Sequence, residues 1–422
     1  MKKFLALILS LTLAATLLVG LASCKDKTNG DNGKVDYTWD ITDGVLNSFK
    51  VTDKAKELIS DKKYGDLATG FNANKGDSFT ADTVKTLDLS KAKVLDKNGK
   101  YTPATITKIT ANAVADLSYI EEIIVPETVT EIELGAFSNL SSLKKITLPF
   151  AGSKKGGQAE KKLFGYIFGT ASSASLTSCT QTYNGGDKDN TATYYVPTSL
   201  ETVVITGEIK KGEKDIYYVI DEEEGTMTIV DESRKDEEGV KTAKVDTYDE
   251  TAVMPYAFSG ITTIKNVEIN GSEIFEGTFK GCTSLNGVTT KAESLIIGKS
   301  AFDGCTSLKA DLFKKVTEVG EGAFKGCTSL GKSTDYAIGN LDLSNVTTIG
   351  ESAFDGCTEM TTLTLNADVE LENLLADKAF NGCSKLIEVR RKGSDTALTI
   401  KEDDPYFTNC NEKLYTKTEE IK

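Results

Sequence analysis

Short apolar segments recur along most of the chain, and polar residues separate the apolar positions within each segment. Two examples are Leu143, Ile146 and Leu148, and Met360, Leu363 and Leu365. Apolar residues at alternate positions are typical of a short β-strand that buries one face. A second short strand is predicted in several segments, at residues 129–132, 316–319 and 346–349. We therefore expect the chain to alternate between strand, turn, strand and a turn that contains phenylalanine.

A six-residue segment repeats almost letter for letter in the second half of the chain. Residues 280–285 return at 303–308 and 325–330, and looser copies begin at positions 355, 381 and 408. Each copy contains a cysteine, and neighbouring cysteines lie 23, 22, 30, 26 and 27 residues apart. Units of this length with regular apolar spacing indicate a leucine-rich repeat solenoid. We predict coils of about 22–30 residues stacked in register, in the α/β horseshoe-like class but built mostly from short β-strands and turns.

The repeated positions have distinct expected roles. Glycine or asparagine stands two places after each phenylalanine, which predicts a turn with positive φ. The phenylalanine rings should stack from coil to coil, and each buried thiol should donate to a backbone carbonyl of a neighbouring coil. Disulfides between adjacent coils are an alternative, because stacking brings their Cα atoms within bridging range. The structural repeat residues are Phe279, Cys282, Phe302, Cys305, Phe324, Cys327, Phe354, Cys357, Phe380, Cys383, Phe407 and Cys410.

The repeats divide the chain into regions. We predict a lipoprotein signal peptide at 1–23, a polar tether at 24–36, an N-terminal cap with a first leucine-rich repeat run at 37–206, a β-hairpin cap or connector at 207–255, and a second leucine-rich repeat run at 256–422. Within the connector, residues 215–220 and 225–230 are expected to pair as the hairpin. A solenoid needs special units at its ends, and residues 37–46 could form the first of them.

The composition argues against several classes of function. The 422 residues include 49 basic and 63 acidic side chains, a net charge of −14, which makes nucleic acid an unlikely partner. Histidine is absent, and with it the most common general base and metal ligand. We therefore predict no catalytic residues, no metal site and no cofactor. A carboxylate pair acting on surface glycans needs no histidine, so this alternative stays open.

The first residues have the features of a bacterial export signal. Two lysines precede the apolar run 4–19, which is shorter than a comfortable membrane span. The run leads into Leu21-Ala22-Ser23-Cys24, which resembles the lipobox at which signal peptidase II cuts before the cysteine. The resemblance implies that Cys24 carries the lipid and anchors the protein outside the cytoplasm, on the cell surface. Ordinary cleavage or an uncleaved anchor are the alternatives.

A polar insertion at 170–193 interrupts the first repeat run. It is rich in Ser, Thr, Gly and Asn, and it contains Cys179, Tyr183 and Asn184. Cys179 has no evident partner in the repeat pattern, so we expect an exposed thiol. Long loops that leave a repeat scaffold often carry binding specificity, which makes these three residues a candidate ligand loop. The alternative is a tolerated disordered bulge without a function.

The repeat motif resembles a known family. Phe-x-Gly-Cys-Thr-Ser-Leu, preceded by Ile-Gly-x-x-Ala or a near variant and joined to strands such as residues 143–149, is similar to the BspA-like leucine-rich repeats of bacterial surface proteins. The similarity is strong over 256–410 and good over 117–150. It implies a secreted or surface-anchored binding protein, with adhesion to host matrix proteins or to other bacteria described for some members. It implies no active site.

These observations favour a lipid-anchored, non-catalytic scaffold or adhesin. Its strand-lined face and loops would bind a host matrix protein, a glycan or another bacterial surface molecule. Thr147, Thr362 and Thr364 are examples of polar strand positions that could make such contacts. A purely structural envelope protein without a ligand is a further alternative to the glycan hydrolase considered above.

Overall fold

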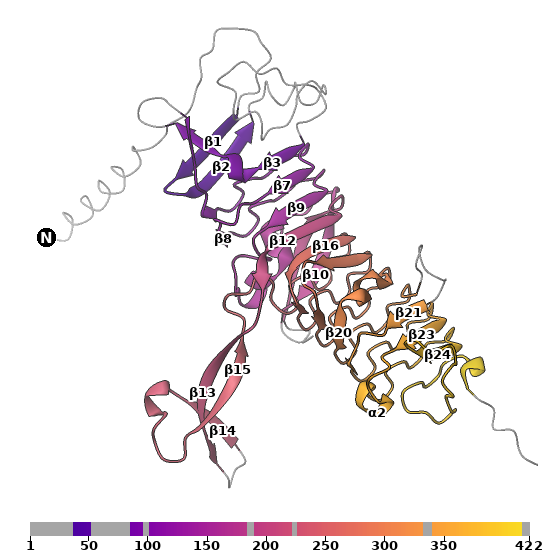
Figure 1. Cartoon of the computed structure of the whole chain (residues 1–422). Helices are drawn as coiled ribbons and strands as arrows, with labels where there is room; N and C mark the ends of the chain where they lie inside the picture. The colour runs from indigo at the N-terminus through magenta and orange to yellow at the C-terminus, as the bar shows by residue number, and fades with distance from the viewer. Residues whose placement is uncertain are drawn as a thin grey trace, which may run out of the picture.

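A computed structural model describes residues 37–51, 85–95, 101–183, 190–221, 226–331 and 340–415. These residues form an elongated stack of coils in which short strands predominate (Figure 1). The signal peptide, the tether, Cys24 and Asn184 lie outside the described residues. Within the described ranges, no helix is both long enough and apolar enough to cross a membrane.

One parallel sheet runs along much of the stack. Its six strands are ordered β18-β16-β12-β9-β7-β3. Each strand comes from a different coil and pairs in parallel with the strands of its neighbours. The strands are β3 (Thr86–Asp88), β7 (Glu122–Ile124), β9 (Lys145–Leu148), β12 (Thr202–Ile209), β16 (Asn266–Gly271) and β18 (Gly287–Thr290). The predicted repeat solenoid of short strands is therefore present.

The sheet gives way to a 3₁₀ turn towards the C-terminus. There η6 (Ala310–Lys314) contacts both β18 and β21, so it occupies the place of a strand in its coil. The parallel sheet β21-β23-β24 then follows. Its strands are β21 (Asn340–Leu343), β23 (Thr362–Leu365) and β24 (Glu388–Arg391).

A second row of very short parallel strands completes the coils. It contains β6 (Lys108–Ile109), β8 (Glu131–Ile132), β17 (Glu273–Ile274), β19 (Leu295–Ile297), β20 (Val316–Val319) and β22 (Thr348–Ile349). At the N-terminal end, the antiparallel hairpin β1 (Tyr37–Thr42) and β2 (Val45–Val51) pairs with β6 through β2. A second small hairpin joins β4 (Lys93–Leu95) to β5 (Tyr101–Pro103). The short helical elements are η2 (Leu89–Lys91), η3 (Ala159–Lys162), η4 (Phe164–Phe168), α2 (Leu371–Leu374) and η7 (Glu412–Leu414).

Stacked phenylalanine rings run through the interior. The rings from Phe258 to Phe407 lie 5.1–5.4 Å apart between centroids, with interplanar angles of 5–22°. The alanine before the ring is fully buried in most coils and leaves room for it. Every glycine or asparagine two places after a ring has positive φ, from 52° at Asn409 to 76° at Gly304. The turn chemistry expected from the repeat is thus the one observed.

Insertions do not interrupt the stack. Strand β12 pairs with β9 on one side and with β16 on the other, although 56 residues separate the ends of β12 and β16 in the sequence. The predicted connector 207–255 therefore leaves the solenoid and returns to it without dividing the two repeat runs. Backbone hydrogen bonds join the chain before the arm to the chain after it, for example from the Ala252 N–H to the Glu208 carbonyl at 2.9 Å.

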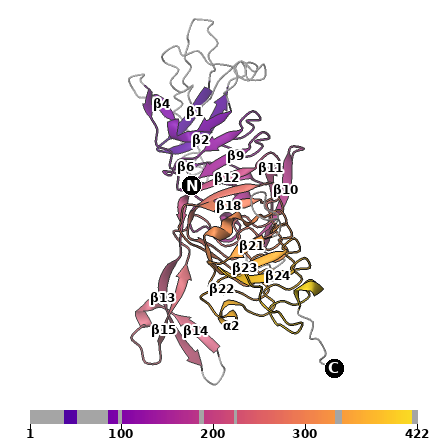
Figure 2. The ribbon, with the colours of Figure 1, turned by 45° about the vertical axis from the view of Figure 1, so that its right-hand side comes forward.

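The connector forms a three-stranded sheet that we call the arm (residues 212–247). It contains β13 (Gly212–Asp221), β14 (Thr226–Val230) and β15 (Lys241–Thr247), with η5 (Glu232–Arg234) before β15. The expected hairpin is present as β13 and β14, but the third strand was not anticipated. The arm does not cap the core. It projects away from the solenoid in two views of the chain (Figures 1 and 2).

Candidate functional site

The outward side of the six-stranded sheet is one candidate surface. We call it the strand-lined face. It combines hydroxyl, amide, charged and aliphatic side chains that are partly or fully exposed, at Thr86, Asp88, Glu122, Ile124, Lys145, Thr147, Thr202, Val204, Asn266, Glu268 and Thr289. The alternate residues of the same strands point into the core, which is why their burial alternates strictly in β9. The sheet therefore presents fixed rows of side chains about 4.8 Å apart.

Ion pairs join neighbouring coils along this face and its border. Glu121 accepts from Lys85 at 2.7 Å and from Lys144 at 2.8 Å, and Lys145 pairs with Glu122 at 2.9 Å. Hydrogen bonds from Lys144 and Lys85 hold the pKa of Glu121 below its ordinary value. Since these groups are partly exposed, each pair adds little stability. On the face itself Lys145 offsets Glu122, whereas Asp88 and Glu268 leave a net negative charge.

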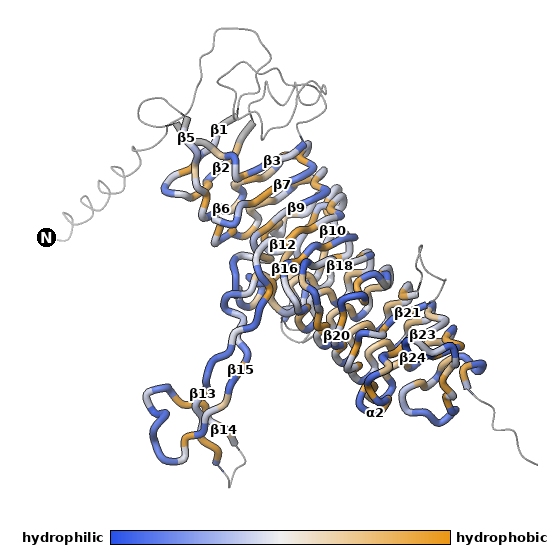
Figure 3. Tube along the Cα trace, viewed as in Figure 1, coloured by the Kyte–Doolittle hydropathy of each residue, from blue (hydrophilic) through white to orange (hydrophobic). Residues whose placement is uncertain are grey.

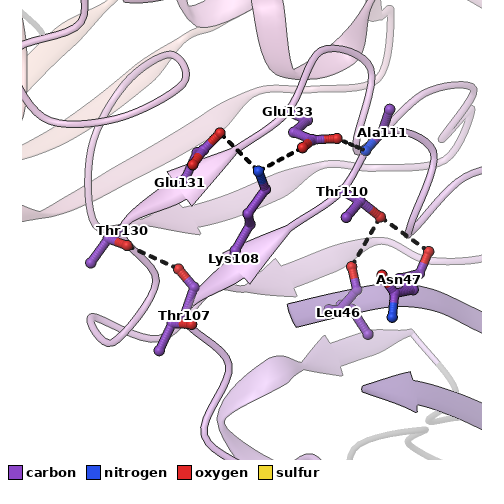
Figure 4. A network of polar contacts seen from close by, with 9 residues as sticks. All are labelled: Leu46, Asn47, Thr107, Lys108, Thr110, Ala111, Thr130, Glu131 and Glu133. Atoms are coloured by element: carbon purple, nitrogen blue, oxygen red, sulfur yellow. Dashed lines mark hydrogen bonds and ion pairs between the residues drawn. The ribbon is translucent and has the colours of Figure 1, made fainter. Parts of the chain in front are cut away.

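A similar network ties the N-terminal cap to the first coils (Figure 4). Lys108 Nζ lies 3.1 Å from Glu131 and 2.7 Å from Glu133. Glu133 also accepts from the backbone N–H of Ala111 at 3.0 Å, and these donors, Lys108 first, lower its pKa. Thr110 donates to backbone carbonyls of β2 at 3.2 Å. Every group in this network bonds a neighbouring coil, so we assign it a structural role.

The insertion 170–193 is an ordered hairpin within its described part. Strands β10 (Leu176–Thr182) and β11 (Thr191–Pro197) pair over seven residues. The expectation of an exposed thiol was wrong, because Cys179 is only 1% exposed. It lies in the hydrophobic core, and burial raises the pKa of its thiol. Tyr183 is partly exposed.

Gln181 is a key residue of this hairpin that the sequence analysis missed. Its Oε1 accepts from the Gly165 N–H at 2.7 Å and its Nε2 donates to the Ala257 carbonyl at 3.0 Å. The fully buried amide thus joins coils on either side of the hairpin. In the sequence, Cys179 and Gln181 stand at alternate positions between serine and threonine residues, and this spacing was the local indication of a strand that buries one face. Ser178, Thr180 and Thr193 face outward, and the last two hydroxyls lie 3.0 Å apart.

The repeat cysteines form a column beside the rings. Each thiol donates to the carbonyl of the phenylalanine in the preceding coil, at 3.0–3.3 Å. All seven described cysteines are free thiols. Burial raises the pKa of Cys282 and Cys305, whereas hydrogen bonding from Cys383 lowers the pKa of the partly exposed Cys410. The column is therefore a packing feature, as its position in the repeat suggests.

The described part of the chain contains no group of three or more metal-binding side chains. A hollow at the root of the arm is lined by Ile209, Ile269, Ile274 and Phe275, which fill it and leave no room for a water molecule. The lining of this hollow is continuous with the hydrophobic core.

Comparison with known proteins identifies the repeats. The family described as the BspA type leucine-rich repeat region matches in six copies, over residues 100–164, 249–335 and 333–413. These ranges cover more than half of the chain. The chain belongs to the BspA-type leucine-rich repeat family. The matched ranges of this BspA-type protein leave out residues 165–248, which contain both the hairpin β10–β11 and the arm. The same unmatched range contains β12 of the six-stranded sheet, so it includes part of the stack as well as the hairpin and the arm.

Solved structures give only distant likenesses to this BspA-type protein. A leucine-rich cell surface protein of Faecalibacterium prausnitzii A2-165 has 16% identity and a TM-score of 0.22, over 87% of this chain and 95% of the other. A leucine-rich repeat protein of Bacteroides ovatus ATCC 8483 has 16% identity and a TM-score of 0.20, over 86% and 94%. The pneumococcal vaccine antigen PcpA has 14% identity and a TM-score of 0.21, over 88% and 89%. Because these TM-scores are low, the family assignment rests on the repeats alone. No curated protein matches the chain.

Proposed function

We propose that this protein is a lipid-anchored, surface-exposed scaffold that binds a macromolecule without catalysis. The observation that carries the proposal is the strand-lined face, in which six coils present aligned hydroxyl, amide and aliphatic side chains, with the outward residues of the hairpin β10–β11 as a second polar surface. Membership of a leucine-rich repeat family supports a binding role. A host matrix protein, a glycan or another bacterial surface molecule would be the partner. The hydroxyl, amide and aliphatic side chains of the face favour a partner that is held by hydrogen bonds and aliphatic contacts.

The anchor is a separate part of the proposal. Cys24 would carry the lipid, because only a cysteine thiol forms the thioether and the preceding residues Leu21, Ala22 and Ser23 suit signal peptidase II. In the producing bacterium, Cys24→Ala is expected to abolish incorporation of labelled fatty acid and to release the protein from the membrane fraction. Ser23→Ala retains a small residue before the cysteine and is the matched control. Labelling that persists in Cys24→Ala would remove the anchor from the proposal.

Binding by the strand-lined face can be tested with paired substitutions. Val204 is a partly exposed aliphatic residue on this face, and Ile296 is a 36% exposed aliphatic residue on the second row of strands. Val204→Lys should weaken capture of matrix proteins or glycans about tenfold, equivalent to about 1.4 kcal/mol. Ile296→Lys makes the same change on the other side and should have little effect.

A second variant tests whether the hairpin or the strand-lined face carries the binding site. Ser178→Lys with Thr193→Lys changes only outward positions of β10 and β11, so the buried contacts of Cys179 and Gln181 should persist. Loss of capture in this variant alone would place the site on the hairpin. Equal capture by the wild type and all three variants would contradict the proposed surface. An absence of any captured partner on matrix and glycan arrays would favour the purely structural role.

A further inference from the structure

The arm is held firmly at its root. Lys211 Nζ lies 2.6 Å from Glu273 of β17 and 3.4 Å from Asp246 of β15. The same ammonium group lies 5.7 Å from the centre of the Phe275 ring, and Tyr248 packs edge-on against that ring at 5.0 Å. These contacts fix the first residues of the arm on the solenoid. The rest of the sheet then extends into solvent in a defined direction (Figures 1 and 2).

Strand register places the apolar side chains of the arm on one face. Ile220 pairs with Met227, and Tyr218 pairs with Ile229. Directly paired residues of antiparallel strands point to the same side of a sheet, and so do residues two apart. We call this the apolar arm face. It consists of Ile216, Tyr218, Ile220, Met227, Ile229, Ala243 and Val245, and the register places Lys214 and Lys241 on the same side, away from β14. No element of the described chain covers its outer part: Ile220, Met227 and Ile229 are 39%, 58% and 64% exposed.

The two edges of the arm differ in their protection. The strand order is β14-β13-β15, so β14 and β15 are the edges. Strand β15 carries Lys241, Lys244 and Asp246, and charged side chains hinder pairing of an edge with another strand. Strand β14 has the sequence Thr-Met-Thr-Ile-Val and carries no charge. Figure 3 shows the contrast between hydrophobic β14 and hydrophilic β15. The open edge therefore adjoins the apolar arm face.

The charge of the arm indicates which kind of partner fits. Residues 212–247 contain twelve acidic and five basic side chains, a net charge of −7, which is half the net charge of the chain in 36 of its 422 residues. Three of the five basic side chains already pair within the arm, namely Lys244 with Glu213, Arg234 with Glu237 and Lys235 with Glu232. A basic partner would be attracted. Two copies of the arm would repel each other, because like charges oppose association.

We propose that β14 and the apolar arm face bind an extended, basic segment of another protein as a fourth strand of the arm. The segment would pair with the backbone of β14 and place apolar side chains on the apolar arm face at every second position. Lysine or arginine at the intervening positions would point to the opposite side of the sheet, where Asp221 of β13 lies opposite Thr226 of β14. This surface is separate from the strand-lined face, so the inference goes beyond the proposed function and does not depend on it.

The test uses a blocked nine-residue peptide of alternating lysine and valine, and the same peptide with glutamate in place of lysine. The intact protein should bind the lysine peptide and not the glutamate peptide, as measured by fluorescence anisotropy. Binding should weaken at least about tenfold when salt is raised from 0.05 to 0.5 M, because the Debye length falls below the spacing of the charges. Ile229→Lys should weaken binding at least about tenfold as well.

Thr228→Lys is the matched control. It introduces the same charge on the same strand but on the opposite face, so its effect should stay below about threefold if apolar contact matters. Both positions are exposed, and circular dichroism should show that both variants fold. Equal binding of the two peptides, or equal binding by Ile229→Lys and Thr228→Lys, would overturn the proposal. A dimer in sedimentation that Ile229→Lys abolishes would overturn it in favour of a second copy as the occupant.

Discussion

Phe324→Ala is expected to lower the free energy of unfolding by about 3–5 kcal/mol, the range typical of a buried phenylalanine replaced by alanine. Phe324 is fully buried, and its ring stacks at 5.2 Å on both Phe302 and Phe354. Phe313 adds a tilted contact at 4.8 Å. Removing the ring leaves a cavity in the middle of the stack. It also deprives both neighbouring coils of a packing partner, so the loss should spread beyond one coil.

Urea unfolding followed by circular dichroism would measure this effect. Phe324→Leu retains most of the buried volume and should lose less than Phe324→Ala. Ile296→Ala removes an aliphatic side chain from the partly exposed second row and should change stability by less than about 1 kcal/mol. A Phe324→Ala protein as stable as Ile296→Ala would show that the rings are not a continuous packing column.

Much of the repeat architecture could be predicted because it is specified locally. The phenylalanine, the glycine or asparagine two places later and the buried cysteine recur in one sequence, so packing and turn geometry can be inferred from each copy. Strand β20 occupies the predicted residues 316–319, and β8 and β22 fall within 129–132 and 346–349. These predictions depend only on short-range patterns.

Features that depend on distant residues could not be predicted. Cys179 is buried because the hairpin β10–β11 packs against η4 on one side and against the coil of Ala257 and Gly260 on the other. At Gly260, a Cβ atom would lie only 2.4 Å from the Thr180 carbonyl oxygen. Glycine is therefore needed at this position for two reasons: the turn, in which Gly260 has a φ of 75°, and the close approach of the Thr180 backbone. Its sequence position matches that of the other repeat glycines, so nothing local indicates the second role.

Strand β15 of the arm and the 3₁₀ turn η6 could not be predicted because their local sequence patterns do not indicate the structure they adopt. Strand β15 has the sequence Lys-Thr-Ala-Lys-Val-Asp-Thr, in which charges obscure the alternation of a strand. In η6, a 3₁₀ turn replaces the strand that the repeat predicts, and buried Leu312 and Phe313 supply the apolar contacts of that coil instead. Whether each of these segments forms a strand depends on the segments beside it, which are distant in the sequence: β13 beside β15, and β18 and β21 beside η6.

The central claim is that both repeat runs form one stack across the arm, and disulfide trapping tests it most directly. Thr202 of β12 lies directly opposite Asn266 of β16, and both point outward. Neighbouring strands are about 4.8 Å apart, within the Cα range that permits a disulfide. The background would carry Cys24→Ala and Cys410→Ser. Cys410 is the only described thiol that is partly exposed, whereas the other six described thiols are buried and so are shielded from oxidation.

In this background, Thr202→Cys with Asn266→Cys should form an intramolecular disulfide almost completely under mild oxidation. Thr202→Cys with Thr289→Cys is the control, since β18 is two strands away and its Cα atoms lie beyond bridging range. Quantitative bridging of the first pair alone, read by mass spectrometry after digestion, is the predicted result. Failure of the first pair to bridge, or equal bridging of both pairs, would contradict a single stacked solenoid.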